Sequence, residues 1–233
     1  MPTALALSPH LDDAAFSAGA TLARLSARGW RVVIATVFTG NVARPQGFAL
    51  ACQLDKGLPP DADYMALRRA EDEAACAALG AEPVHLPHLE APHRGYDDAP
   101  ALFAGVRADD DATDAVEASL RDLLATHRPA LLLAPRCVGG HVDHVVVREA
   151  LENLNRLYTV YWTDWPYADK PAPQDPFAAA DARRRVVDVP TAPHLPAKLA
   201  ACAAYTTQLG YQFGGEAGML ESFGAVSAER FVI

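Results

Sequence analysis

The stretch Ser8-Pro9-His10-Leu11-Asp12-Asp13 stands where a short apolar run, Thr3 to Leu7, gives way to a predicted helix. A histidine and two adjacent acids at the end of a first strand contribute little to a hydrophobic core, because such side chains are mostly exposed unless they are paired. One aspartate at this place is commonly a helix N-cap, but a cap needs only one. The second aspartate therefore indicates chemistry at the end of this strand.

A second polar cluster, Gly139-Gly140-His141-Val142-Asp143-His144, follows another apolar run, Ala130 to Ala134, and opens another predicted helix. Taken alone, two histidines three positions apart on a helix usually mark a solvated face. In open α/β sheets, however, ligands bind in the crevice outside the carboxyl ends of the strands. If the two strands are close neighbours, both clusters meet there, and their imidazoles and carboxylates suit a divalent metal, zinc above all.

The composition is that of an ordinary globular protein. The chain has 233 residues, of which 51% are hydrophobic and 21% are charged. This length and usage fit one α/β domain with a sizeable core. We expect a single domain over residues 1–233, with a less regular C-terminal third from about residue 164 onward.

Charge, cysteine spacing and hydropathy narrow the class of function. The net charge of −9 at pH 7 opposes nonspecific binding to nucleic acid or to anionic lipid. The first apolar run has no basic region before it, and no apolar window approaches transmembrane length. The four cysteines lie apart without a CxxC pair, which argues against a disulfide scaffold and against a structural zinc site. We therefore expect a cytoplasmic protein with a small-molecule substrate, no nucleic-acid partner and no membrane span.

Apolar runs alternate with amphipathic stretches along the chain, which predicts a Rossmann-like α/β fold with a mostly parallel sheet flanked by helices. The expected strands are Thr3–Leu7, Arg31–Phe38, Glu82–Leu86, Pro129–Ala134, Leu157–Trp162 and Arg185–Val189. The expected helices are Asp13–Arg28, Asp63–Leu79, Thr113–His127, His141–Asn155 and Leu195–Gln208.

Two segments, Gly40–Pro60 and Leu86–Asp111, are too long to be simple connections. Long loops in compact domains are often functional, so we expect these two to roof the site and to carry specificity.

The pattern His-x-Asp-Asp after the first strand, with Gly-His-x-Asp-His much later, resembles the PIG-L or LmbE-like family of zinc-dependent N-deacetylases. The resemblance covers most of the chain. Arg68-Arg69-Ala70-Glu71 is similar to the family's Arg-x-x-Glu helix, and Tyr161–Tyr167, Tyr205–Gln208 and Ala228–Phe231 look like its later landmarks. The resemblance implies the LmbE-like fold and a hydrolase that removes an acetyl or short acyl group from an N-acetylated amino sugar or glycoconjugate, such as one of N-acetylglucosamine.

By motif position, the resemblance implies that His10, Asp13 and His144 hold one zinc ion per chain, with another divalent metal as the alternative. Asp12 would be the general base that takes the proton of the attacking water, since adjacent residues at a helix start point in different directions. His141 would stabilise the oxyanion as an imidazolium, and Asp143 would orient His141 and stabilise its charge.

Three residues are expected to contact the substrate: Arg68, Glu90 and Arg94. Arg68 matches an arginine of the family, although an arginine on an amphipathic helix is more often a surface charge. Glu90 falls where the family usually has an aspartate, and its longer side chain leaves its role open. Arg94 follows in the same segment, with solvent as its alternative surroundings.

One departure from the family concerns the oxyanion. The tyrosine that some relatives place two residues before the second-motif histidine is absent, because Gly139 stands there. Oxyanion stabilisation would then depend on zinc and His141, or on a tyrosine from elsewhere such as Tyr161 or Tyr167.

Other functions remain alternatives. A receiver-like phosphoacceptor domain also has paired acids after its first strand, but Val37-Phe38-Thr39-Gly40 offers no acid and such a domain is about half this length. A noncatalytic metal- or sugar-binding protein on the same fold has no need of Asp12 and His141, although fold alone does not fix function. Among hydrolases, an amidase or esterase acting on another acylated molecule such as a thiol conjugate is the alternative. The sequence leaves the oligomeric state open, a homo-oligomer included.

Overall fold

A computed structural model of the chain describes residues 1–154, 158–171 and 173–233. Its centre is a seven-stranded sheet in the order β3-β2-β1-β4-β5-β7-β6. The strands are β1 (Thr3–Ser8), β2 (Arg31–Thr36), β3 (Glu82–His85), β4 (Leu131–Pro135), β5 (Thr159–Trp162), β6 (Val186–Pro190) and β7 (Ala228–Val232). The first five strands pair in parallel, whereas β7 is antiparallel to both β5 and β6. The predicted, mostly parallel sheet is thus confirmed.

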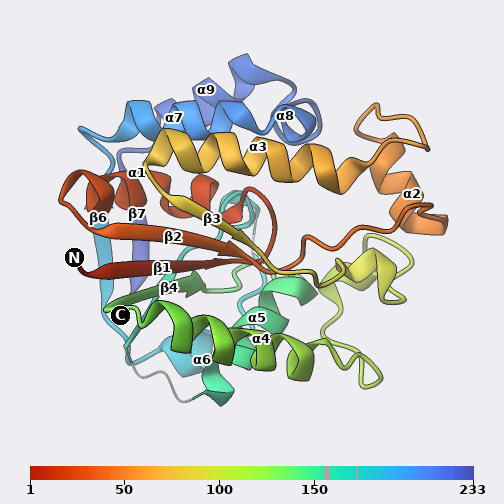
Figure 1. Cartoon of the computed structure of the whole chain (residues 1–233), viewed down its shortest axis with the longest axis horizontal. Helices are drawn as coiled ribbons and strands as arrows, with labels where there is room; N and C mark the ends of the chain where they lie inside the picture. The colour runs from red at the N-terminus through yellow and green to blue at the C-terminus, as the bar shows by residue number, and fades with distance from the viewer. Residues whose placement is uncertain (155–157, 172) are drawn as a thin grey trace.

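Helices cover both faces of the sheet (Figure 1). One layer holds α1 (Asp13–Ala27), α3 (Tyr64–Leu79), α7 (Leu195–Ala204), α8 (Thr206–Phe213) and α9 (Glu216–Gly224), and the other holds α4 (Ala112–His127), α5 (Val142–Asn153) and α6 (Ala178–Asp181). The short helix α2 (Gly47–Leu54) lies beyond the carboxyl ends of the first strands (Figure 1). Within the described residues, the connecting segments also contain the 3-10 helices η1 (Ala91–His93), η2 (Ala101–Phe103) and η3 (Tyr167–Asp169). No helix in the described ranges is long and apolar enough to cross a membrane.

The core lies on both sides of β1, which is an interior strand between β2 and β4. Ala4 and Ala6 belong to the apolar cluster beneath α1 and α7, whereas Leu5 and Leu7 belong to the cluster against α4 and α5. Successive side chains of a strand point to opposite faces, so β1 packs into both clusters at once. The turn that follows β1 therefore leaves the sheet between the ends of β2 and β4.

The C-terminal third differs most from the sequence-based prediction. The helix expected over Leu195–Gln208 is divided into α7 and α8 at Tyr205, whose hydroxyl donates to Asp72 Oδ1 over 2.7 Å. Glu71 then accepts the backbone N–H of Thr207 at the start of α8, over 2.7 Å. The sequence analysis also did not predict α2, α6, α9 and β7. The expected helix end at Asn155 and strand start at Leu157 fall outside the described residues.

A buried ion pair joins β7 to the helices above it. Lys198 Nζ of α7 lies 2.8 Å from Glu229 Oε1, and the two side chains are 2% and 1% exposed. The same carboxylate accepts the backbone N–H groups of Ala20 and Thr21 in α1, over 2.9 and 2.8 Å. These contacts fix the antiparallel strand to the helix whose first residue is Asp13.

Replacing Glu229 by alanine leaves Lys198 buried without a counter-charge and deprives two amides of α1 of their acceptor. We expect Glu229→Ala to lower the free energy of unfolding by about 3–5 kcal/mol, as breaking a buried pair does, measured by urea denaturation. The matched control is Arg230→Ala on the same strand, whose ion pair with Asp188 is 60% and 47% exposed. Because exposed pairs contribute little, equal losses in the two variants would contradict this account.

Candidate metal centre

The two polar clusters meet at the carboxyl ends of neighbouring strands. β1 pairs directly with β4, so the turn that carries His10 and Asp13 lies beside the loop that leads into α5. In that loop, Gly139 and Gly140 have φ angles of +98° and +74°. Few residues other than glycine adopt such angles, and they let the chain turn sharply before His141. The convergence predicted from the sequence is therefore present.

Three side chains, those of His10, Asp13 and His144, point their ligand atoms at one place, and these atoms lie within 4.8 Å of one another. Asp13 Oδ2 is 3.1 Å from His10 Nδ1 and 3.2 Å from His144 Nε2. Although Asp13 is so close, His144 Nε2 is buried without a hydrogen-bond partner in the described structure. A buried, unbonded nitrogen beside a carboxylate oxygen is explained if both atoms coordinate one cation. Two imidazoles and a carboxylate also form a donor set that zinc accepts.

On the ring nitrogen that faces away from Asp13, each of these two imidazoles contacts a further carboxylate. His10 Nε2 lies 2.9 Å from Asp143 Oδ2, and His144 Nδ1 lies 2.8 Å from Asp164 Oδ1. Metal-ligating histidines usually donate their second N–H to such a carboxylate, which fixes the tautomer and the ring orientation. This arrangement leaves His10 Nδ1 and His144 Nε2 free to face a cation.

Another group, His10, His141 and Asp143, also brings its ligand atoms within 4.8 Å. Both carboxylate oxygens of Asp143 are already engaged, because Oδ2 accepts from His10 and from the backbone N–H of Ala91, and Oδ1 accepts from Arg94 over 2.8 Å. Burial raises the pKa of Asp143, but the hydrogen bond from His10 and the surrounding positive charges hold it well below its usual range. A carboxylate bound to an arginine is a poorer ligand, so the group of His10, Asp13 and His144 is the better candidate.

The structure differs from the roles expected for Asp143 and His141. The Asp143 carboxylate contacts His10 and Arg94, and only its backbone N–H reaches His141, donating to Nδ1 over 3.2 Å. The cause is local, since His141 is the N-cap of α5 and its ring accepts from the first turn. Burial, followed by the charge of His10, lowers the pKa of His141 to about 3. Such a low pKa favours a neutral ring, whereas the sequence analysis expected an imidazolium.

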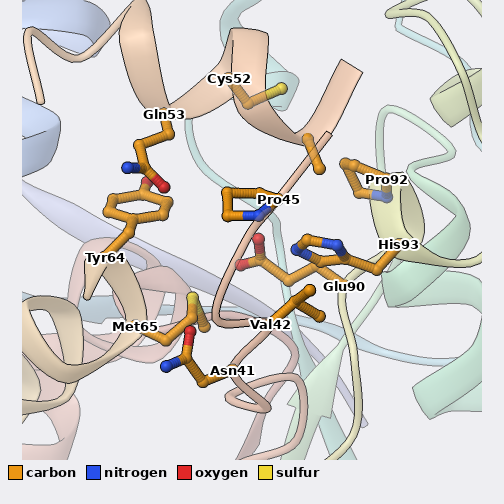
Figure 2. Close-up of a pocket in the computed structure, with 11 residues that line it drawn as sticks. Asn41, Val42, Pro45, Cys52, Gln53, Tyr64, Met65, Glu90, Pro92 and His93 are labelled. Carbon is orange, nitrogen blue, oxygen red and sulfur yellow. The ribbon is translucent and has the colours of Figure 1, made fainter. Parts of the chain in front are cut away.

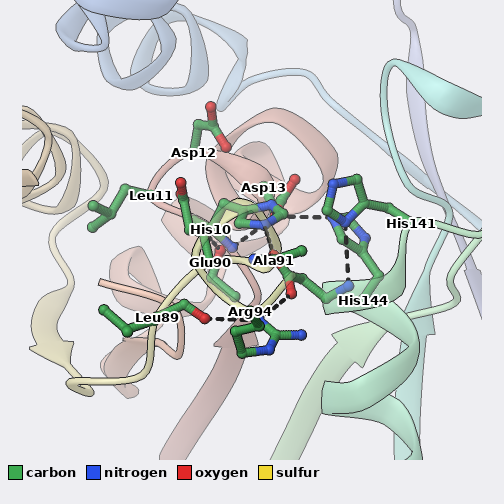
Figure 3. A network of polar contacts seen from close by, with 12 residues as sticks. His10, Leu11, Asp12, Asp13, Leu89, Glu90, Ala91, Arg94, His141 and His144 are labelled. Carbon is green, nitrogen blue, oxygen red and sulfur yellow. Dashed lines mark hydrogen bonds and ion pairs between the residues drawn. The ribbon is translucent and has the colours of Figure 1, made fainter. Parts of the chain in front are cut away.

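Asp12 stands beside the metal group without joining it. Its carboxylate lies 3.6 Å from Arg68 Nη2 and accepts from Gln212 Nε2 over 3.4 Å. Figure 3 shows Asp12 pointing away from the network that surrounds His10. Burial and the negative charge of Asp13 raise the pKa of Asp12 to about 7. A carboxyl group with a pKa near neutrality can accept and return a proton at working pH.

Arg68, in α3, is buried and connects Asp12 to Glu90. Its Nη1 lies 2.5 Å from Glu90 Oε1, while Nη2 faces Asp12. The side chain is only 6% exposed, so it is not the surface charge that was its alternative. Arg68 and Glu90, two of the three residues expected to contact the substrate, therefore lie together next to Asp12, the expected base.

A pocket of about 360 Å³ adjoins the ion pair of Arg68 and Glu90 (Figure 2). Both segments that were expected to roof the site contribute to its wall, together with the start of α3. The lining residues are Asn41, Val42, Pro45, Ala49, Cys52, Gln53, Tyr64, Met65, Glu90, Pro92 and His93. Glu90 is thus both a wall of the pocket and a partner of Arg68.

Arg94, by contrast, is engaged within the protein. Its Nε and Nη2 donate to Asp110 over 3.1 and 2.9 Å. Its Nη1 donates to Asp143 over 2.8 Å and to the Leu89 carbonyl over 2.7 Å, the latter contact being visible in Figure 3. All three nitrogens are therefore used internally. In this structure Arg94 holds Asp143, and Asp143 holds His10, whereas the contact of Arg94 with a substrate stays a prediction.

The sequence analysis assigned no role to Asp164, which supports His144. This residue follows the end of β5, the strand next to β4. Its Oδ2 accepts the backbone N–H of Val138 over 2.9 Å, which fixes it against the loop before α5. An acid just after a strand that adjoins β4 was the signal that could have identified it.

Comparisons with known proteins agree with this geometry. A family model described as PIG-L, GlcNAc-PI de-N-acetylase, matches residues 5–155, a range that contains both polar clusters. The 2'-N-acetylparomamine deacetylase of Streptomyces fradiae is 34% identical over 169 residues, which are 70% of this chain and 57% of that protein. The matched region therefore spans little more than half of that relative.

Two solved structures are similar over nearly their whole length. The zinc-inhibited form of the teicoplanin deacetylase Orf2 has a TM-score of 0.81 at 25% identity, and the match covers 99% of this chain and 97% of that one. The A40926 pseudoaglycone deacetylase Dbv21 has a TM-score of 0.78 at 29% identity, over 98% and 95% of the two chains. With the family model matching well over half of its length, this chain belongs to the PIG-L family.

Proposed function

We propose that this protein is a zinc-dependent N-deacetylase that removes an acetyl group from the amine of an N-acetylated amino sugar or glycoconjugate. The observation that carries the proposal is the buried, unbonded His144 Nε2 beside Asp13 and His10, with Asp12 next to them. Proteins similar to it bear the names of deacetylases of such compounds. Its four free cysteines fit a reducing compartment, so we propose that the protein acts in the cytoplasm.

His10, Asp13 and His144 would hold the zinc ion, which when bound supplies Lewis-acid polarisation of the acyl carbonyl and of the attacking water. Asp12 takes a proton from that water as its oxygen bonds to the acyl carbon. Asp12 then returns the proton to the nitrogen as the C–N bond breaks, giving acetate and a free amine. Arg68 and Gln212 hold the Asp12 carboxylate in place during both transfers.

His141 contributes to the oxyanion without being charged. Because Nδ1 accepts the backbone N–H of Asp143, the proton of the neutral ring resides on Nε2. Nε2–H can then donate a hydrogen bond to the developing negative charge. A neutral imidazole thus performs the role that the sequence analysis gave to an imidazolium.

The direct test of the activity is incubation of the zinc-loaded protein with a panel of N-acetylated amino sugars and their conjugates. We expect release of acetate and free amine in equal amounts. Turnover of ester substrates alone would contradict the proposal.

Asp12→Asn removes the base while keeping the size of the side chain. We expect kcat to fall by about 10²–10⁴-fold, the usual contribution of a general base, with the zinc content unchanged by elemental analysis. Asp55→Asn, at a residue with no contact to the metal group, serves as the control. Full activity in Asp12→Asn would refute the assigned base.

The supporting role of Asp143 predicts a change in metal affinity. Asp143→Asn alters the acceptor behind His10, so zinc should bind about 10–100-fold more weakly, as after other losses of such partners, measured by competition with a chelating dye. Asp109→Asn is the matched control, because its carboxylate is 71% exposed and pairs with Arg107, outside the chain of contacts from Asp110 to His10. If both variants bind zinc like the wild type, Asp143 does not support the ligand.

A further inference from the structure

Tyr167 lies against the metal group but has no part in the account so far. It begins η3, in the segment after β5 that also provides Asp164. The backbone N–H of Ala168 donates to the Asp164 carbonyl over 3.0 Å, so one turn holds both side chains. The Tyr167 ring centroid is 5.5 Å from that of His144, edge to face at 86°, and 6.3 Å from that of His141.

Gly139 makes the space for this ring. A Cβ atom at position 139 would lie 2.6, 2.7 and 2.9 Å from Cβ, Cγ and Cδ1 of Tyr167, closer than real Cβ contacts come. The Gly139 backbone N–H also donates to the Gln174 carbonyl over 2.6 Å, which joins the loop before α5 to the segment after β5. Tyr167 therefore occupies the volume that a side chain two residues before His141 would take.

Packing accounts for the ring but not for its hydroxyl. Phe103 contacts the ring at a centroid distance of 5.9 Å, and Lys170 Nζ lies 5.0 Å from its centroid. Both contacts would serve a phenylalanine equally well.

Tyr161, the other tyrosine raised by the sequence, is placed differently. It lies in β5, and its hydroxyl is directed to Glu152 Oε1 at 3.5 Å. The Arg148 guanidinium lies 4.2 Å from its ring centroid. Tyr161 therefore packs against Arg148 and α5, and it offers no donor to the metal group.

We propose that Tyr167 is a catalytic residue whose hydroxyl donates a hydrogen bond to the oxyanion, together with Nε2–H of His141. The inference rests on the proposed deacetylase function. Water adds to the acyl carbon, and the π electrons of the carbonyl move onto its oxygen. Tyr167 keeps its proton and stabilises that charge until the carbonyl forms again and the amine leaves. Gly139 acts as a positioning residue, because it admits the ring.

The test compares Tyr167→Phe with Tyr161→Phe, which removes a hydroxyl from a buried ring away from the site. In the zinc-loaded enzyme, Tyr167→Phe should lower kcat by about 10²–10³-fold, as loss of an oxyanion donor does, with KM and zinc content unchanged. Tyr161→Phe should keep kcat within about twofold of the wild type, because its hydroxyl touches no reacting atom.

A second readout needs no knowledge of the substrate. Methylphosphonate imitates the tetrahedral anion derived from an acetyl group, and calorimetric titration measures its affinity for the zinc-loaded proteins. We expect about tenfold weaker binding to Tyr167→Phe, the loss of one charge-assisted hydrogen bond, and no change for Tyr161→Phe.

The outcomes separate the two proposals. If Tyr167→Phe has the same kcat or the same methylphosphonate affinity as the wild type, the role of Tyr167 is overturned and the deacetylase function stands. The same conclusion follows if the wild type does not bind methylphosphonate. If the wild type releases acetate from no member of the panel, the deacetylase function is overturned, and the methylphosphonate comparison still decides whether the hydroxyl faces a tetrahedral anion.

Discussion

A carboxylate buried between two imidazoles is the constraint on which the rest of this structure depends. Asp13 is 5% exposed, and its Oδ2 accepts the backbone N–H of His10 over 2.8 Å while facing the rings of His10 and His144. Burial raises the pKa of Asp13, but the charges of the two histidines outweigh this effect and hold it well below its usual range. A negative charge at such a depth requires positive partners. A divalent cation would provide them while leaving the histidines neutral, so metal binding at this site would be coupled to proton release.

The supports of this group extend into the segment that roofs it. His10 is held by Asp143, Asp143 by Arg94, and Arg94 by Asp110, which also accepts the hydroxyl of Tyr96 over 2.9 Å. One chain of contacts therefore joins the segment 86–111 to the first ligand. On the opposite side, the segment after β5 orients the other histidine and carries the phenol that we assign to the oxyanion. The two halves of the site are thus each fixed by a loop, and the first of these, segment 86–111, also lines the pocket.

The sequence predicted the parts of the fold that local pattern determines, namely β1 to β6, α1 and α3 to α5, and the meeting of two motifs at one sheet edge. It failed where distant residues decide. The orientation of Asp143 depends on Arg94, 49 positions away, so no local pattern indicates that its carboxylate turns from His141 to His10. Asp164 belongs to no short motif, and the break between α7 and α8 follows from a hydrogen bond to α3. Strand β7 pairs with partners on both sides and has no short-range signal of its antiparallel direction.

Anomalous diffraction from crystals of the protein, recorded at the zinc absorption edge, tests the central claim most directly. The account predicts one peak per chain about 2.0–2.2 Å from His10 Nδ1, an Asp13 carboxylate oxygen and His144 Nε2, with Asp12 outside the coordination sphere. A single peak between His10, His141 and Asp143 would contradict it, as would zinc bound without Asp13.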